Sequence, residues 1–286
     1  MTDTHLVLGG TGKTGTRLVR HLTAAGATAR PAARTPGPAA PGVEPVRFDW
    51  DDPSTHDAAL AGARGAYLVP PALRLDYADQ LAALTRRAVG AGVERLVLLS
   101  ARGPADPSVP DPLTGVIDAV RSAAGDVGVT VLRPSWFAQN FTESFFVPGI
   151  RAEGALVAPT GDGAHPFIDA DDIAAVAAAA LTQDGHAGRT YDLSGPVALT
   201  FAQAAAVLTP YAGREVRHVD VPVDDWRAGA VAGGLPEEYG HLLAALLTAI
   251  REGRDAHVSD GVQQALGRPA TPLEDWAARE AGVLAG

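Results

Sequence analysis

Leu6-Val7-Leu8-Gly9-Gly10-Thr11-Gly12-Lys13-Thr14-Gly15, residues 6–15, is the segment that decides the fold. The apolar run His5–Leu8 before it predicts a short strand. Apolar residues at helical spacing follow it, namely Leu18, Val19 and Leu22. A strand, a turn with G-x-x-G-x-x-G spacing and a helix, in that order, predict a Rossmann-type dinucleotide site.

Each of three glycines in this turn has its own expected task. Gly9 permits the tight turn, Gly12 lets a pyrophosphate approach the backbone, and Gly15 lets the helix pack against the sheet. The N-terminus of the helix then offers free N–H groups and a partial positive charge to phosphates. A purely structural glycine turn is the alternative. A Walker A loop does not fit, because its first glycine would fall on Val7.

Strand and helix patterns alternate through the first two thirds of the chain. The further expected strands are Ala27–Ala33, Val46–Phe48, Ala66–Val69, Arg95–Leu99 and Val129–Leu132. The expected helices are Asp57–Ala61, Asp76–Ala91 and Leu113–Ala124. Arg102–Pro112 carries four prolines and predicts a loop. This alternation predicts an α/β fold with a Rossmann-type, doubly wound parallel sheet.

After residue 150 the alternation gives way to a mixed pattern, which predicts a small α+β lobe. We expect residues 1–150 to form the dinucleotide-binding domain, with 166–185 packing back on it. Residues 151–165 and 186–286 are then the smaller lobe. Ligands of doubly wound folds lie at the carboxyl ends of the strands, so this lobe would cover the substrate.

The end of the expected second strand distinguishes the two nicotinamide cofactors. NAD sites usually carry an acidic residue there for the ribose hydroxyls. This chain has no acidic residue between Asp3 and Glu44, and Arg30 and Arg34 lie there instead. Because a guanidinium suits a 2′-phosphate, the sequence predicts NADP(H). Asp49-Trp50 falls where the adenine edge is expected, and capping of the next helix explains Asp49 equally well.

Composition excludes several classes of protein. The chain has no cysteine, so disulfides and thiolate chemistry are absent. The net charge of −10 argues against nucleic acid as a partner. No apolar run is long enough for a membrane span, and the start lacks a signal peptide. We expect a cytoplasmic location, no metal site, and a homodimer as the assembly to be considered.

The later blocks of sequence, together with the glycine turn, resemble a known family. They are Leu98-Leu99-Ser100, Val131–Phe141, Phe167–Ala174 and Ala265–Pro269. In these the chain resembles the NmrA-like atypical short-chain dehydrogenases, and most of all their type-2 NADPH:quinone oxidoreductases and triphenylmethane-dye reductases. The likeness covers nearly the whole chain and is most specific in Leu132–Phe141.

The resemblance implies an extended NADP(H) across the sheet and a small aromatic or quinonoid substrate. The pyrophosphate contacts it implies are Thr11, Gly12, Lys13 and Thr14, and Arg34 would meet the 2′-phosphate. The residues implied around the ribose and nicotinamide are Val69, Pro70 and Ser100. Trp136, Phe137 and Asn140 would line the substrate side. Core packing is the alternative role of Trp136 and Phe137.

The Tyr-x-x-x-Lys pair of standard short-chain dehydrogenases is missing, because Lys13 is the only lysine in the chain. Ordinary ketone reduction needs an acid for the developing alkoxide. A hydroquinone anion has a phenol-like pKa of about 10 and can take its proton from water. Hydride transfer to a quinone or another flat, electron-poor acceptor therefore remains feasible, with Asn140 as the hydrogen-bond donor.

Two further functions stay open at the level of sequence. One is a non-catalytic redox sensor that binds NADP(H) and regulates a partner protein. The other is a non-redox tailoring enzyme, an isomerase or a cyclase, on the same fold. The fold alone does not separate these from a reductase.

Overall fold

A seven-stranded sheet forms the centre of the molecule in the computed structural model, which describes residues 2–103, 113–144 and 146–285. The strands are β1 (Thr4–Leu8), β2 (Thr28–Ala33), β3 (Val46–Arg47), β4 (Gly65–Leu68), β5 (Arg95–Leu99), β6 (Val129–Pro134) and β9 (Thr190–Leu193). Their spatial order is β3-β2-β1-β4-β5-β6-β9, and each neighbouring pair is parallel. The predicted fold class is confirmed.

The order of the strands reverses between β1 and β4, which are adjacent in space. A crevice opens at such a switch point, outside the carboxyl ends of the strands. The residues that follow β1, β2, β4, β5 and β6 therefore share one edge of the sheet. This edge is where the predicted site residues come together.

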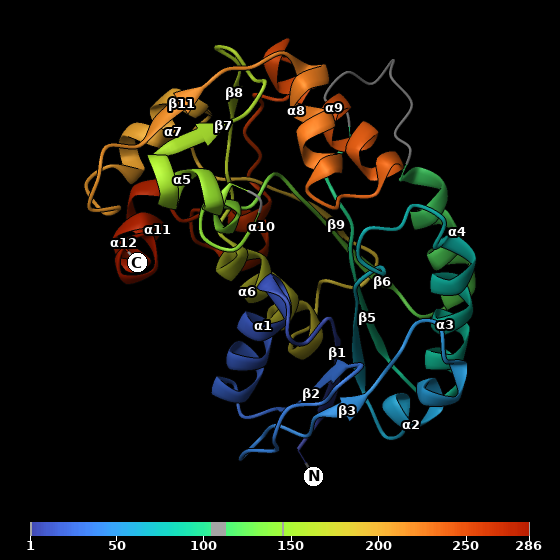
Figure 1. Ribbon diagram of the computed structural model, residues 1–286. Coiled ribbons are helices and arrows are strands. Elements are labelled where there is room, and N and C mark those ends of the chain that lie inside the picture. Colours follow the sequence, from blue (N-terminus) through green and yellow to red (C-terminus); the bar gives the residue numbers. More distant parts are fainter. Residues whose placement is uncertain (1, 104–112, 145, 286) are drawn as a thin grey trace.

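Helices cover both faces of the sheet (Figure 1). One face carries α1 (Lys13–Ala24) and α6 (Ala170–Thr182). The other carries α2 (His56–Leu60), α3 (Ala78–Gly90) and α4 (Thr114–Ala124). Side chains alternate across a strand, so Leu6 and Leu8 face the second group of helices, whereas Val7 faces the first. Both faces of β1 are thus buried, as in other parallel sheets.

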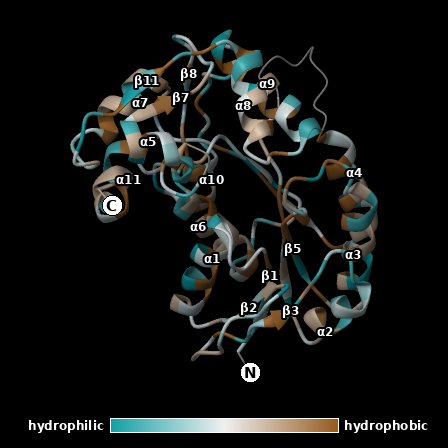
Figure 2. Ribbon diagram, viewed as in Figure 1, coloured by the Kyte–Doolittle hydropathy of each residue, from teal (hydrophilic) through white to brown (hydrophobic). Residues whose placement is uncertain are grey.

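The hydropathy of the chain agrees with this layering. In Figure 2, strand β5 is mainly hydrophobic, whereas the helix α3 alternates between hydrophobic and hydrophilic residues. Within α3 the buried positions, among them Leu81, Leu84 and Ala88, recur every three or four residues. That spacing places one face of the helix on the sheet and the other in water.

The C-terminal half adds a third hydrophobic core, beyond the carboxyl ends of the strands. Its short strands are β7 (Ala155–Val157), β8 (Ala164–His165), β10 (Leu199–Thr200) and β11 (Arg217–Val219). Its helices are α5 (Val147–Glu153), α7 (Phe201–Leu208), α8 (Val223–Ala232), α9 (Glu237–Arg251), α11 (Leu273–Arg279) and α12 (Ala281–Ala285). The 3-10 turns η1 (Pro53–Thr55) and η2 (Ala138–Phe141) complete the elements of the fold, together with α10 (Gly261–Leu266).

Part of the segment assigned above to the small lobe belongs to the main sheet. Strand β9 pairs with β6 at the edge of the sheet, and Val262 of α10 packs into the core beneath α6. Strand β9 has only four residues, and nothing in its sequence indicates β6 as its partner strand. The lobe boundary expected at residue 186 was therefore wrong for this part. Whether the remainder is an independent lobe stays a prediction. Most of the predicted loop Arg102–Pro112 lies outside the described residues.

The described helices are all too short or too polar to cross a membrane. The longest of them, α9, has 15 residues. A span needs roughly 20 predominantly apolar residues.

Candidate functional site

The glycine turn between β1 and α1 is built by close backbone contacts. Gly9 has a positive φ of +61°, which favours glycine. A Cβ on Gly15 would lie 2.1 Å from the carbonyl oxygen of Gly9, and a Cβ on Gly10 would lie 2.5 Å from Pro31. A Cβ on Gly12 would lie 3.2 Å from the same carbonyl, a tight but smaller conflict. The turn therefore needs glycine for its shape at positions 9, 10 and 15.

The start of α1 fits a bound phosphate. Gly12 is the N-cap and has no side chain to bond the first-turn N–H groups, while its own N–H donates to the carbonyl of Gly9 at 2.8 Å. The first N–H groups of a helix have no partner within the helix. The amides of Lys13 and Thr14 are thus available to an anion, supported by the helix dipole of a 12-residue helix.

The side chain of Thr14 has a different partner. It is buried, and its Oγ1 accepts a hydrogen bond from the hydroxyl of Tyr67 at 3.2 Å. Tyr67 lies on β4 and is fully buried, which raises the pKa of its phenol and keeps it neutral. The pair fixes the first turn of α1 on the sheet. Sequence reasoning missed Tyr67, because an aromatic residue in an apolar strand predicts only core.

Arg30 and Arg34 are in contrasting surroundings. Arg30 donates to the carbonyls of Ala59 and Ala61, the first at 3.2 Å and the second at 2.6 Å, and pairs with Glu44. Arg34 is exposed, and within the described parts of the chain no ion pair or hydrogen bond of its side chain is recorded. Arg30 is therefore structural, whereas the guanidinium of Arg34 is free to meet a ligand.

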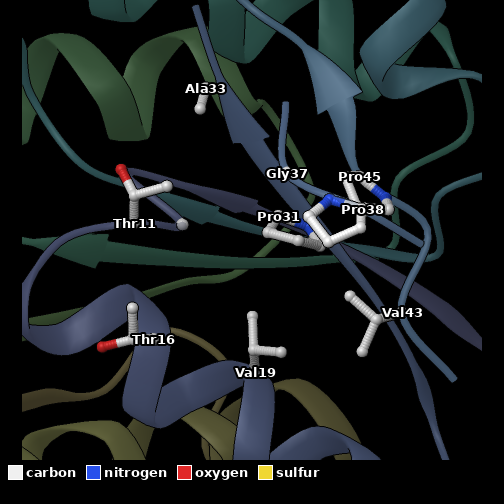
Figure 3. A pocket seen from close by; sticks show the side chains of 10 residues that line it. Thr11, Thr16, Val19, Pro31, Ala33, Gly37, Pro38, Val43 and Pro45 are labelled. Carbon is white, nitrogen blue, oxygen red and sulfur yellow. The ribbon is translucent and has the colours of Figure 1, made fainter. Parts of the chain in front are cut away.

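A cleft of about 190 Å³ lies beside this position (Figure 3). It opens between the glycine turn, represented by Thr11, and the Pro/Gly segment after β2, represented by Gly37 and Pro38. Ala33, the residue before Arg34, also lines it. The cleft thus joins the phosphate cradle to the end of β2.

Asp49 and Trp50 follow β3. The carboxylate of Asp49 accepts a hydrogen bond from the amide of Asp51 at 3.1 Å, so it caps a local turn. Trp50 packs edge-on against Phe48 and lies on the core between the sheet and α2. The following 3-10 turn η1 is capped by Asp52 and not by Asp49, and Trp50 is half-buried.

Val69, Pro70 and Ser100 lie after β4 and β5, on the other side of the switch point, and all three are half-buried. The two methyl groups of Val69 lie 3.6 and 3.8 Å from the position that a Cβ on Gly9 would take. The amide of Ser100 donates to the carbonyl of Leu132 at 2.8 Å and thereby extends the β5–β6 pairing. The structure brings these three residues to the same edge as the glycine turn.

Trp136 and Phe137 begin the segment after β6. Trp136 packs against the C-terminal core, and Phe137 packs against the core beneath α6 and bridges to Ile168. Both are half-buried, so each supports a core on one side and has exposed surface left. Core packing is therefore a real part of their role, as considered above.

Asn140 lies in η2 and meets Lys13 across the crevice. The Nζ of Lys13 donates to Oδ1 of Asn140 at 3.2 Å. The pyrophosphate contact implied for Lys13 stays a prediction; in the structure Lys13 is the first residue of α1, and its ammonium is directed to Asn140. Burial lowers the pKa of Lys13 from its usual value. The charge of neighbouring Arg17 lowers this pKa further, whereas the carboxylate of Glu143 partly raises it.

A buried network behind Trp136 was not predicted from the sequence. His165 Nδ1 lies 3.0 Å from Asp255 Oδ2, and the amide of Trp136 donates to His165 Nε2 at 2.9 Å. Arg102 donates to the same carboxylate at 2.6 Å. Burial lowers the pKa of His165, so the ring is neutral and carries its proton on Nδ1. Nε2 accepts from the backbone and Nδ1 faces the Asp255 carboxylate, which makes His165 a structural residue and not a free base.

Among the described residues, no three or more ligating side chains come together in a way that could hold a metal ion. Asp169, which precedes α6, caps that helix by accepting from the amide of Asp171 at 2.9 Å. Of the other two acidic residues there, Asp171 pairs with Arg20 and His21, and Asp172 pairs with Arg268, so capping explains Asp169 alone.

Fold and phosphate cradle together define a Rossmann-type dinucleotide-binding protein. The chain belongs to the NmrA-like family, whose model matches residues 1–277. Two curated relatives cover almost all of it. The uncharacterized oxidoreductase YesF of Bacillus subtilis is 36% identical over 96% of this chain and 94% of its own length. The NAD(P)H azoreductase of Xenophilus azovorans is 34% identical over 98% of both chains.

One solved structure gives a complementary comparison. The triphenylmethane reductase of Citrobacter sp., solved with NADP(H), superposes with a TM-score of 0.75 at 25% identity. The match covers 96% of this chain and 99% of the other. The resemblance inferred from the sequence is confirmed by these relatives.

Proposed function

We propose that the protein is an NADPH-dependent reductase that transfers a hydride to a quinone or a similarly flat, electron-poor acceptor. One observation carries the proposal. Arg34 after β2, the uncapped start of α1 after β1, and the half-buried Asn140 after β6 lie along one edge of the sheet. This is the order that the 2′-phosphate, the diphosphate and the acceptor of an extended dinucleotide require. Relatives named as an oxidoreductase and as an NAD(P)H azoreductase support the same class of reaction.

The cofactor is NADP(H), and each part of it has a matching group in the chain. The amides of Lys13 and Thr14 bind the diphosphate, and Gly12 leaves room for it. The exposed guanidinium of Arg34 binds the 2′-phosphate beside the cleft at Thr11. When bound, NADPH supplies the hydride.

Val69, Pro70 and Ser100 confine the reactive ring on the side of β4 and β5. The exposed surfaces of Trp136 and Phe137 offer flat apolar contact to an aromatic acceptor and keep water away. Placement of two rings in contact supplies much of the catalysis in such a site. Asn140 donates a hydrogen bond to an acceptor oxygen as negative charge develops on it.

The reaction balances without an acidic side chain. The acceptor gains a hydride, which is two electrons and one proton, and a quinone becomes a hydroquinone anion. Its conjugate acid has a phenol-like pKa of about 10, so the anion can leave and take the second proton from water. This accounts for the missing Tyr-x-x-x-Lys pair.

The test is to mix the purified protein with NADPH and a panel of quinones, azo dyes and triphenylmethane dyes, and to follow the absorbance of the reduced nicotinamide. We expect NADPH to be consumed with at least one of them. Asn140→Ala should lower the rate by about 10²–10³ and leave NADPH binding intact. Tight binding of NADPH without oxidation by any acceptor would favour the redox sensor instead.

A further inference from the structure

Lys13 connects the two halves of the crevice. It is the first residue of α1, and its backbone belongs to the phosphate cradle. Its side chain extends to η2 beyond β6, where Nζ lies 3.2 Å from Oδ1 of Asn140, a residue 127 positions away. No other lysine exists in the chain. Its ammonium therefore lies between the start of α1, the proposed phosphate site, and η2, on the proposed acceptor side.

The positive charge of Lys13 is not cancelled by direct contact. The neighbouring carboxylate of Glu143 forms an ion pair with Arg17, with Nη2 and Oε1 2.8 Å apart. Within the described residues, the recorded hydrogen-bond partner of the Lys13 ammonium is the neutral amide of Asn140, and no ion pair is recorded for it. Charges that are partly buried are screened less than those in open water.

The contact also decides which way the amide of Asn140 faces. An ammonium can only donate, so it must take the oxygen of the carboxamide. The Nδ2 group is then left on the other side, and no partner for it is recorded in the described part of the chain. A half-buried N–H₂ group without a partner is ready to donate to a bound molecule.

We propose that Lys13 is a positioning residue that also sets acceptor selectivity. It holds Asn140 with Nδ2 toward the acceptor, and its charge favours acceptors that become negative on reduction over acceptors that arrive as cations. This inference rests on the proposed function. A quinone gains a hydride, becomes an anion close to Lys13 and then takes a proton from water. A cationic dye arrives with a positive charge, which Lys13 repels. It becomes neutral when it gains a hydride, so its product is not stabilised by Lys13.

The experiment compares three acceptors of different charge: naphthoquinone sulfonate, benzoquinone and the cationic dye malachite green. For each, kcat/KM is measured in the wild type, Lys13→Met and Lys13→Arg, and the Kd for NADPH is measured separately. We expect Lys13→Met to lower the ratio of kcat/KM for the anionic over the cationic acceptor by about tenfold or more. Lys13→Arg, which keeps the charge and the donors, should largely retain the wild-type ratio.

Asn140→Asp provides a second variant. Its carboxylate can accept from Lys13 but cannot donate to the acceptor. Reduction of both quinones should fall strongly, while malachite green should be affected least. This variant and Lys13→Arg carry the test if Lys13→Met fails to fold.

Arg20→Met is the matched control. Arg20 lies on the same helix, 70% exposed, and pairs with Asp171 at 3.5 Å, away from Asn140. Its removal changes the net charge by the same amount and should leave the acceptor ratio unchanged. An unchanged ratio in Lys13→Met, or an equal shift in Arg20→Met, overturns the inference while the reductase function stands. A wild type that reduces none of the acceptors overturns the proposed function, and the inference falls with it.

Discussion

The two arginines at the end of β2 show how surroundings separate residues that look equivalent in the sequence. Arg30 lies within the sheet and is bonded to the carbonyls that end α2. Arg34 lies one residue beyond β2, beside the cleft at Thr11, and makes no recorded contact within the described residues. A guanidinium kept in water without a partner costs little, and it is ready for a bidentate phosphate contact.

At this scale we predict that Arg34→Ala weakens NADPH and leaves NADH nearly unchanged. Loss of a charge-assisted hydrogen bond to phosphate costs about 1.5–3 kcal/mol, roughly a tenfold to hundredfold change in Kd. Quenching of tryptophan fluorescence or calorimetry with both cofactors measures this. Arg47→Ala is the control, because Arg47 is exposed and pairs only with Asp52 in the described structure. Equal weakening of both cofactors by Arg34→Ala would show that Arg34 does not hold the 2′-phosphate.

The turn between β1 and α1 was predictable because all its signals are local. Glycine spacing, the apolar strand before it and the helical pattern after it lie within about 20 residues. Strand β9 was misplaced because only its pairing with β6, some 60 residues earlier, makes it part of the sheet. The Lys13–Asn140 contact and the His165–Asp255 pair are likewise long-range, and no spacing rule reports them. The sequence therefore predicts the elements and their class better than their side-chain partners.

For this element we predict different outcomes for two glycines. Gly12→Val should abolish dinucleotide binding in a folded protein, since its φ of −87° suits any residue and its Cβ conflict is mild. Gly15→Val should unfold the turn, because its Cβ would overlap the carbonyl oxygen of Gly9. Circular dichroism and thermal melting separate folding from binding. Wild-type NADPH affinity in Gly12→Val would place the phosphate elsewhere.

Across the whole molecule, a buried polar network joins the sheet to the C-terminal core. Arg102 follows β5, Trp136 follows β6, His165 lies on β8 and Asp255 follows α9. Two hydrogen bonds and the 3.0 Å contact between His165 and Asp255 link all four. The side chain of Arg102 is only 3% exposed and that of His165 is fully buried. Loss of one member leaves the others buried without partners, which costs more than the bond itself contributes. The network thus fixes Trp136 relative to the crevice.

This network should make stability fall on mild acidification. Burial lowers the pKa of His165 below its usual value of about 6.5, so the folded protein keeps the ring neutral while the unfolded chain binds a proton. Below pH 6.5 the unfolded state therefore binds more protons, and the free energy of unfolding decreases by up to about 1.4 kcal/mol per pH unit for this group. Urea unfolding at pH 7.5, 6.5 and 5.5 measures the slope.

His165→Asn, which cannot titrate but keeps a donor and an acceptor, should be less stable at pH 7.5 and show a shallower slope of unfolding free energy between pH 6.5 and 5.5. His241→Asn, at an exposed position, should keep the wild-type slope. If His165→Asn and the wild type lose stability equally over this range, the acid sensitivity arises at another buried histidine, such as His5, whose pKa burial also lowers.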